Sequence, residues 1–241
     1  MTAMTLRTTT ALSLVGLFGI AFAAGCGGEP DVDLNTLAIA DEGGKADSLG
    51  TDVGDYSWTR AIPGFVQCIK APCPSTKLYA VNTGEQRFIY RIDWRALKLT
   101  QTETEDAEAK AGSMLMYGRF VTARALGENV LVYQVTRANL PAADRAGDKF
   151  DADKYYWPSA TKECIANPQC TTLQSGLLNK RNQTETWSNL DLLRLELTPA
   201  AEKTLFAELK EGKNYVSVIG VQGGVARATQ VFRPFKAPPL K

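Results

Sequence analysis

Histidine is absent from this chain of 241 residues. Its absence excludes Ser-His-Asp and Cys-His catalysis and every metal site that needs an imidazole ligand. An excess of either charge is absent as well, because 27 basic residues stand against 26 acidic ones. Nucleic-acid binding depends largely on neutralising phosphates with Lys and Arg. We therefore expect no nucleic-acid partner.

Long apolar runs are also scarce, and the longest lies near the N-terminus. Residues 11–24 hold no charged side chain and follow a segment whose one charge is Arg7. This run of 14 residues is shorter than the roughly 20 that a transmembrane helix needs. The pattern predicts a secretory signal peptide over residues 1–25.

The apolar run ends in Ala23-Ala24-Gly25-Cys26, which resembles the lipobox of bacterial lipoproteins. In that family the Cys thiol receives a diacylglyceryl group, and the chain is cleaved before it. The resemblance implies lipidation of Cys26, a membrane partner reached through this lipid anchor, and an exported protein of the cell envelope. Gly27 after the Cys favours the outer membrane. Ordinary cleavage after Ala23, with Cys26 left as a thiol, is the alternative.

Residues 26–55 are rich in Gly and in acidic side chains, and they contain one basic residue, Lys45. Such a composition buries too little apolar surface to form an ordered core. We expect an acidic, Gly-rich tether, which as a flexible coil would span roughly 30 Å.

Cysteines are few, and besides Cys26 the chain has Cys68, Cys73, Cys164 and Cys170. An even number of cysteines in an exported chain implies disulfides, and four cysteines allow three pairings. We favour the local pairs, Cys68 with Cys73 and Cys164 with Cys170, because each pair has the same place in a repeat. A zinc site built from all four is the alternative.

Two segments of the remaining chain follow the same plan, about 98 residues apart. Each opens with a Tyr-x-Trp triplet, at Tyr56 and at Tyr155, and a cysteine pair follows. Further on, residues 92–100 (IDWRALKLT) match residues 190–198 (LDLLRLELT). So many matches in order indicate a duplication. The predicted division is a repeat domain at 56–140, a linker at 141–154, a second repeat domain at 155–235 and a tail at 236–241.

Each repeat alternates apolar and polar residues in short runs that predict strands. Thr100 with Glu103 forms a capping box before a helix over residues 101–111, and Thr198 with Pro199 starts the corresponding helix. The predicted fold class is α+β, mainly β, with the order strand, strand, strand, helix, strand, strand in both repeats. That order resembles the OB-fold, a small five-stranded barrel. A plain sheet with one helix packed on it is the alternative.

The first repeat contains Cys68, Cys73, residues 77–82 (KLYAVN) and residues 92–93. On these residues it is similar to an uncharacterised domain family of lipoproteins from predatory soil bacteria. The chain departs from that family by lacking paired glycines after the second Cys and a further Cys pair downstream. The family has no assigned activity, so the resemblance implies location and architecture alone.

Catalytic candidates are weak. Ser159 and Lys162 fit the S-x-x-K pattern of penicillin-binding enzymes, but the other elements of those enzymes are missing, and a loop is the better interpretation. Asp93 and Asp191 form a carboxylate pair of the kind used in glycoside hydrolysis, but their matching places in two repeats favour a cap or turn role. We predict no catalytic residue, no metal site and no cofactor. An envelope hydrolase that uses carboxylates is the alternative.

Five side chains are candidates for ligand binding: Trp58, Trp94, Trp157, Trp187 and Lys70. Tryptophans suit a sugar- or peptide-binding face, but the repeat makes Trp58 and Trp157 equivalent, which favours core packing. Lys70 lies in a Pro-stiffened loop between Cys68 and Cys73, where a protease inhibitor would present a bait residue. A stapled surface loop is the plainer interpretation.

Together these patterns predict a non-enzymatic lipoprotein of the cell envelope. Its two repeats would act as a binding or interaction module for an envelope protein or glycan. A protease inhibitor is a further alternative.

Overall fold

The computed structural model describes residues 56–62, 71–143, 152–165 and 169–240. Strands make up most of the elements in these ranges, with three α-helices beside them. The α+β fold class, mainly β, is thus confirmed. The signal peptide, the tether and the predictions for Cys26, Cys68 and Lys70 lie outside the described residues.

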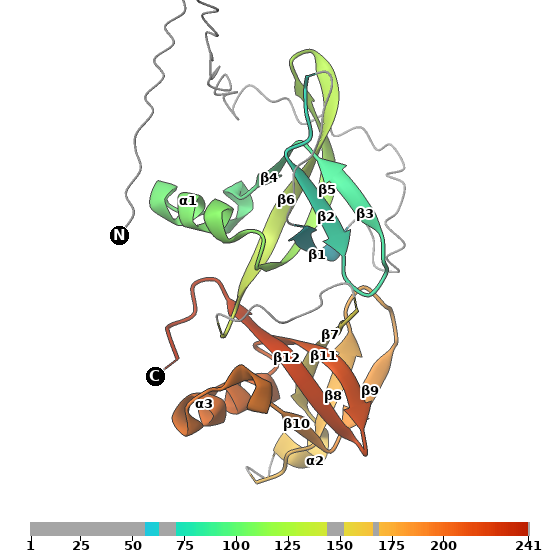
Figure 1. Ribbon diagram of the computed structural model, residues 1–241, viewed down its shortest axis with the longest axis vertical. Coiled ribbons are helices and arrows are strands. Elements are labelled where there is room, and N and C mark those ends of the chain that lie inside the picture. The colour runs from blue at the N-terminus through green and yellow to red at the C-terminus, as the bar shows by residue number, and fades with distance from the viewer. Residues whose placement is uncertain (1–55, 63–70, 144–151, 166–168, 241) are drawn as a thin grey trace, which may run out of the picture.

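The first half of the molecule, residues 56–143, lies above the second half, residues 152–240 (Figure 1). The first half contains β1 (Tyr56–Ile62), β2 (Thr76–Ala80), β3 (Gln86–Ile89), β4 (Arg91–Asp93), the 3₁₀-helix η2 (Arg95–Leu97), α1 (Gln101–Lys110), β5 (Leu115–Ala125) and β6 (Glu128–Pro141). The second half contains β7 (Lys154–Ala160), α2 (Lys162–Ile165), β8 (Leu173–Leu177), β9 (Thr184–Trp187), β10 (Asn189–Asp191), η3 (Leu193–Leu195), α3 (Pro199–Lys210), β11 (Tyr215–Gln222) and β12 (Val225–Pro234).

The halves have the same order of elements in the described part of the chain, apart from the short helix α2. The third predicted strand is divided into two short strands, at Tyr90 in the first half and at Ser188 in the second. That the halves descend from a duplication stays a prediction, as do the domain boundaries.

Ten of the described strands hydrogen-bond in one open path, β3-β2-β1-β5-β6-β12-β11-β7-β8-β9. All neighbours on this path are antiparallel. Two parallel pairings lie off it, β4 with β6 and β10 with β12. In each half the parallel pairing joins the end of the third, divided strand to the last strand. The last strand pairs with the strand before it, which pairs with the first strand, so the pairings in each half run in a ring. Such a ring, with a helix between the third and fourth strands, fits the predicted resemblance to the OB-fold.

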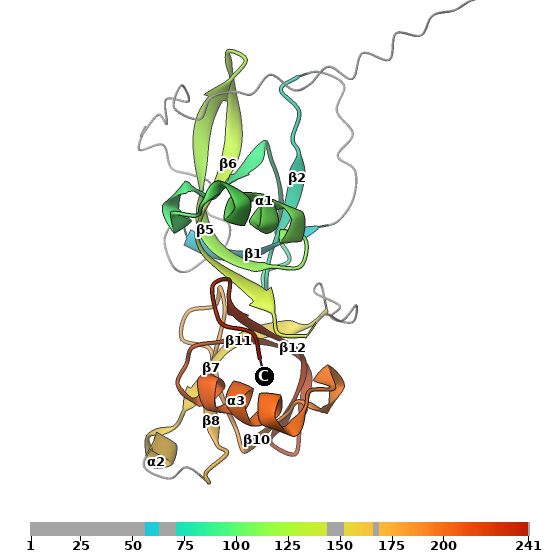
Figure 2. The ribbon, with the colours of Figure 1, turned by 90° about the vertical axis from the view of Figure 1, so that its left-hand side faces the viewer.

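The helices begin where the capping residues predict. Thr100 accepts a hydrogen bond from the backbone N–H of Glu103, and the Glu103 carboxylate accepts one from the N–H of Thr100. The hydroxyl of Thr198 accepts from the N–H of Ala201, and Pro199 is the first residue of α3. Both helices lie on the same side of the molecule (Figure 2). None of the helices in the described ranges has the length and apolar character to cross a bilayer.

Each half has its own apolar core, around Trp94 in the first and around Trp187 in the second. A third cluster contains buried residues of both halves: Trp58, Tyr79, Val81, Leu115, Tyr155, Leu178 and Phe232. The backbone also crosses the boundary, because β6 pairs with β12 from Asn139 to Pro141. The two halves are therefore joined by a shared core and a shared sheet.

Candidate functional site

Asn82, in the turn after β2, binds the backbone of the second half. Its Nδ2 donates to the carbonyl oxygens of Tyr155 and Leu178, at 2.8 Å in both cases. Its Oδ1 accepts from the N–H of Tyr155 at 2.9 Å. The residue has a φ of 64°, a left-handed conformation that Asn tolerates better than most residues.

Asn179, in the turn after β8, makes the reciprocal contacts with the first half. Its Nδ2 donates to the carbonyl oxygens of Trp58 and Val81, at 2.7 and 3.0 Å, and its Oδ1 accepts from the N–H of Trp58 at 2.7 Å. Its φ is 57°. We call Asn82 and Asn179 the asparagine clamp. The clamp fixes the first strands of the two halves against each other.

A buried cation strengthens the same boundary. Arg60 on β1 is 5% exposed, and its Nη1 donates to the hydroxyl of Tyr155 at 3.1 Å. The guanidinium carbon lies 5.4 Å from the ring centroid of Phe232 on β12, a cation–π distance. Residues of β1, β7 and β12 thus hold one another in a fixed arrangement.

Beside this boundary lies a cavity of about 440 Å³ with an aromatic lining from both halves. Trp58 and Tyr117 come from the first half, and Trp157 and Tyr215 come from the second. The ring centroid of Trp58 lies 4.8 Å from that of Tyr117 and 4.3 Å from that of Tyr215. We call this cavity the aromatic groove. Because its walls belong to different halves, its shape depends on the clamp.

Trp157 is the exposed aromatic ring of the aromatic groove, with 51% of its surface accessible. Its indole Nε1 donates to the carbonyl oxygen of Gly212 at 2.7 Å, so the polar edge of the ring is already satisfied. A Cβ at Gly212 would come within 3.3 Å of that nitrogen, and the φ of this residue is +70°. Glycine therefore allows the close approach that holds the ring, and the face of the indole is left to solvent or a ligand.

The prediction that Trp157 packs in the core like Trp58 is wrong. The clamp shows that the counterpart of Trp58 is Tyr155, because each of these residues bonds an asparagine through both its N–H and its C=O. The sequence match at the Tyr-x-Trp triplets is therefore two residues out of register. A shift of two residues leaves a side chain on the same face of the strand. It places Tyr155 in the buried position that corresponds to Trp58, and Trp157 lies two residues further along the strand, where it is exposed.

The charged groups at the aromatic groove are Arg137 and Lys180, and no carboxylate lines it in the described part of the chain. The guanidinium of Arg137 lies 5.5 Å from the ring centroid of Tyr117 and hydrogen-bonds the side chain of Tyr215. Burial raises the pKa of the Tyr215 hydroxyl from 10.0, and the hydrogen bond from Arg137 only partly opposes it. The hydroxyl is therefore neutral at neutral pH, and the groove is aromatic and positively charged.

A neighbouring cavity of about 370 Å³ shares Arg137 and Tyr215 with the aromatic groove. It continues past Ala138 and Phe235 to two lysines, Lys213 and Lys236, which already pair with Glu211 and Glu103 respectively. The two cavities together offer room for an extended ligand.

No family model, curated protein or solved structure matches the chain. The resemblances of the chain to bacterial lipoproteins and to a lipoprotein domain family therefore stay predictions.

The remaining tryptophans are not brought to the aromatic groove. Trp94 and Trp187 are 4% and 0% exposed in the separate cores of the two halves. Tyr117, Arg137 and Tyr215, which the sequence did not single out, line the groove instead.

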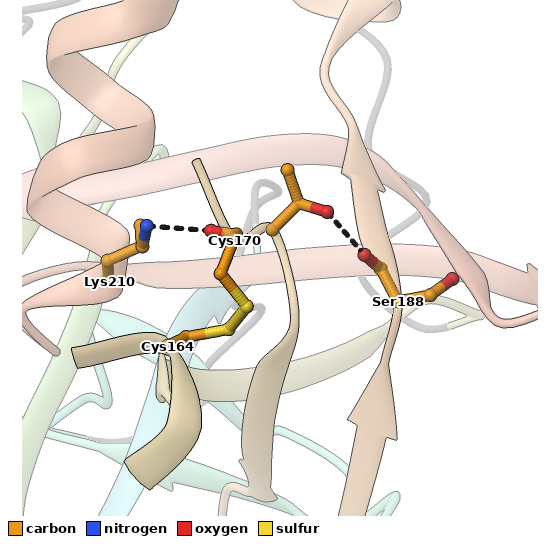
Figure 3. The surroundings of a disulfide bond; sticks show 5 residues. Cys164, Cys170, Ser188 and Lys210 are labelled. Carbon is orange, nitrogen blue, oxygen red and sulfur yellow. Dashed lines mark hydrogen bonds between the residues drawn. A yellow bond between two sulfur atoms is a disulfide. The ribbon is translucent and has the colours of Figure 1, made fainter. Parts of the chain in front are cut away.

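The predicted disulfide between Cys164 and Cys170 is present, with the Cα atoms 5.1 Å apart (Figure 3). Lys210, the last residue of α3, donates from Nζ to the carbonyl oxygen of Cys170 at 2.7 Å, so the loop is bound to the helix. This disulfide rules out zinc coordination by all four cysteines. Cys73 is also in a disulfide, and its predicted partner lies outside the described residues.

Asp93 and Asp191 each cap the turn that follows them, as predicted. The Oδ1 of Asp93 accepts from the N–H of Arg95 at 3.0 Å, and that of Asp191 accepts from the N–H of Leu193 at 2.9 Å. Burial raises the pKa of Asp93, but hydrogen bonds from the side chain and backbone of Arg95 outweigh it and hold that pKa below 3.8. In the described chain no hydrogen bond joins Ser159 to Lys162.

Proposed function

We propose that this protein is a non-enzymatic lipoprotein of the cell envelope, anchored by a lipid on Cys26, whose aromatic groove binds an acidic glycan. The half-exposed indole of Trp157 carries the proposal. It lies in a groove with three further aromatic rings and two cations.

The lining of the groove matches the chemistry of such a ligand. The C–H faces of sugar rings pack against aromatic planes, and the satisfied N–H of Trp157 leaves its ring face free for that contact. Arg137 and Lys180, with no carboxylate beside them among the described residues, favour a ligand with carboxylate or phosphate groups. A nucleic acid would need a larger excess of positive charge than this chain has.

Calorimetric titration of the purified full chain tests glycan binding. The probes are oligogalacturonate, which is acidic, and a dextran oligomer, which is neutral. We expect saturable binding of the acidic probe, and Trp157→Ala should weaken it by about tenfold or more, as expected for the loss of one aromatic contact. Phe88→Ala is the matched control, because Phe88 is 52% exposed and lies outside the groove. Equal affinity of Trp157→Ala and the unmodified chain would refute the proposal.

The lipid anchor has a separate test. Cys26→Ser should move the protein from the membrane fraction to the supernatant and abolish labelling by a palmitate analogue, because the thiol is the attachment point of the thioether lipid. A mutant that stays labelled and sediments with membranes would disprove lipidation at Cys26.

A further inference from the structure

A third cavity, of about 550 Å³, lies in the first half between α1 and the segment of β4 and η2. Its charged and polar lining includes Arg91, Trp94, Lys98, Thr104 and Glu108. It shares no residue with the aromatic groove. We call it the helix cavity.

Two side chains of the helix cavity carry buried N–H groups without an acceptor. The Nε and Nη2 atoms of Arg91 and the Nε1 atom of Trp94 are buried, and none of them has a hydrogen-bond partner in the part of the chain that the structure describes. Trp94 as a whole is 4% exposed. Folded proteins pair nearly all their buried donors, because an unpaired one loses its bonds to water and gains nothing in return. Three such donors on two side chains that line one cavity indicate a missing acceptor.

Cations outnumber carboxylates in the lining of the helix cavity, with Arg91, Arg95 and Lys98 against Glu108, and this balance favours a negatively charged acceptor. Arg95 is occupied by Asp93, which accepts from its Nε at 2.9 Å and its Nη2 at 2.8 Å. No ion pair joins Arg91 to another residue in the described ranges. Burial lowers the pKa of its guanidinium from 12.5, and the charge of Asp93 opposes this only in part. Lys98 adds a further positive charge at the rim.

The second half shows that the fold does not need these donors. Strand β10 pairs with β12 as β4 pairs with β6, which makes Asn189 the counterpart of Arg91. By the same alignment Leu192 takes the place of Trp94 and is just as deeply buried, at 3% exposure. Lys98 and its counterpart Glu196 both have left-handed backbones, with φ of 50° and 48°. The same backbone thus forms with an apolar side chain and the opposite charge.

We propose that the helix cavity binds an oxyanion, a carboxylate or phosphate group, which accepts hydrogen bonds from the Arg91 guanidinium and the Trp94 indole N–H. A planar guanidinium donates to two oxygens of such a group at once, and the indole supplies a third donor. The anion would satisfy the buried N–H groups and balance the charge of Arg91. The inference is independent of glycan binding in the aromatic groove.

The test is nuclear magnetic resonance of the full chain with ¹⁵N-labelled tryptophan, which gives one indole signal for each of its 4 tryptophans. The indole signal that is missing from the spectrum of Trp94→Phe belongs to Trp94. Sodium phosphate and sodium acetate are titrated in turn at constant ionic strength, with sodium chloride as the balance. We expect a saturable downfield shift of the Trp94 signal, while the signal of Trp187, which is buried in the core of the other half, stays in place. The anion that binds more tightly identifies the group as phosphate or carboxylate.

Arg91→Gln should weaken this binding by at least tenfold. Arg124→Gln is the matched control, because it removes one exposed positive charge from the same half outside the cavity. If Arg91→Gln fails to fold, Lys98→Glu replaces it as the test variant. This change introduces the residue that the second half has at the corresponding position, and it should weaken anion binding several-fold. Trp157→Ala should bind the anion normally, which separates this inference from the glycan proposal. A Trp94 signal that fails to shift with either anion, or that shifts equally in Arg91→Gln, overturns the inference.

Discussion

The two halves have matching strands but use their helices differently. α3 buries Ala201, Leu205 and Leu209, whereas α1 buries Ala107 alone. α3 is also tied down by an ion pair in which Glu208 accepts from Nε and Nη2 of Arg233 on β12, at 2.8 and 2.7 Å. The ion pairs of α1, with Lys236 and within the helix, are exposed.

This difference explains where the helix cavity comes from. A helix with large apolar side chains fills the space between itself and the strands, while a helix that offers one alanine leaves part of that space empty. The donors of Arg91 and Trp94 lie in the half with the poorly sealed helix. One backbone plan therefore supports a helix packed through buried leucines in the second half and a helix with a lined cavity beside it in the first.

The largest loss of stability is expected when a buried leucine of α3 is shortened. Leu205→Ala should lower the free energy of unfolding by about 2 to 5 kcal/mol, because Leu205 is fully buried and the vacated space cannot fill. The matched change in α1, Ala107→Gly, should cost about 1 kcal/mol. Urea denaturation followed by circular dichroism measures both. Equal losses would show that the two helices contribute alike.

The clamp should come next. Asn179→Gly keeps the left-handed backbone and removes three hydrogen bonds, so it should cost about 3 kcal/mol at roughly 1 kcal/mol for each backbone group left unpaired. Asn82→Gly should cost less, because Asn82 is only half-buried. We expect the unmodified chain to unfold in a single calorimetric transition, because the halves share a core and a sheet. In Asn179→Gly this transition should broaden or split as the halves separate. A sharp, unshifted transition would mean that the clamp does not join them.

The third prediction concerns acid. The hydrogen bond from Arg233 lowers the pKa of Glu208 from 4.5, and burial opposes it only in part. A carboxyl whose folded pKa is depressed stabilises the fold above its unfolded pKa, and this contribution is lost as the pH falls from about 4.5 through the folded pKa. Glu208→Gln should cost about 1 to 3 kcal/mol at pH 7. It should also flatten the fall in stability below pH 4.5, measured by urea titration at several pH values. An unchanged slope would contradict this role.

The smallest effects are expected at the helix caps. Thr100→Ala removes one side of a capping box and should cost about 1 kcal/mol, with α1 losing protection in amide hydrogen exchange first. Thr198→Ala should cost less in α3, where Pro199 and the buried leucines also hold the helix. A larger loss from Thr198→Ala would reverse the comparison between the helices.

Local chemistry made the elements predictable. Alternation, the two capping threonines and the spacing of Cys164 and Cys170 each act within a few residues, so the sequence contains the whole signal. The structure bears out the helix starts, the fold class and that disulfide.

The aromatic groove could not be predicted in the same way, because it depends on how the halves are placed. That placement is set by Asn82 and Asn179, whose turns have a left-handed backbone that brings each side chain to the other half. The sequence did contain a signal, since Val81-Asn82 and Leu178-Asn179 follow the second strand in both halves. The match of Trp58 with Trp157 concealed this signal, because that match aligns the first strands of the two halves two residues away from the register seen in the structure.

The division of the aromatic groove between the halves has a thermodynamic consequence. A ligand that touches Trp58 from one side and Trp157 from the other binds only the docked arrangement, so it stabilises that arrangement by an amount that grows with the logarithm of its concentration. At one hundred times its dissociation constant, the gain is about 2.7 kcal/mol. In the Asn179→Gly variant such a ligand would make the two halves unfold as a single unit again, so the cooperativity of unfolding would report that the groove is occupied.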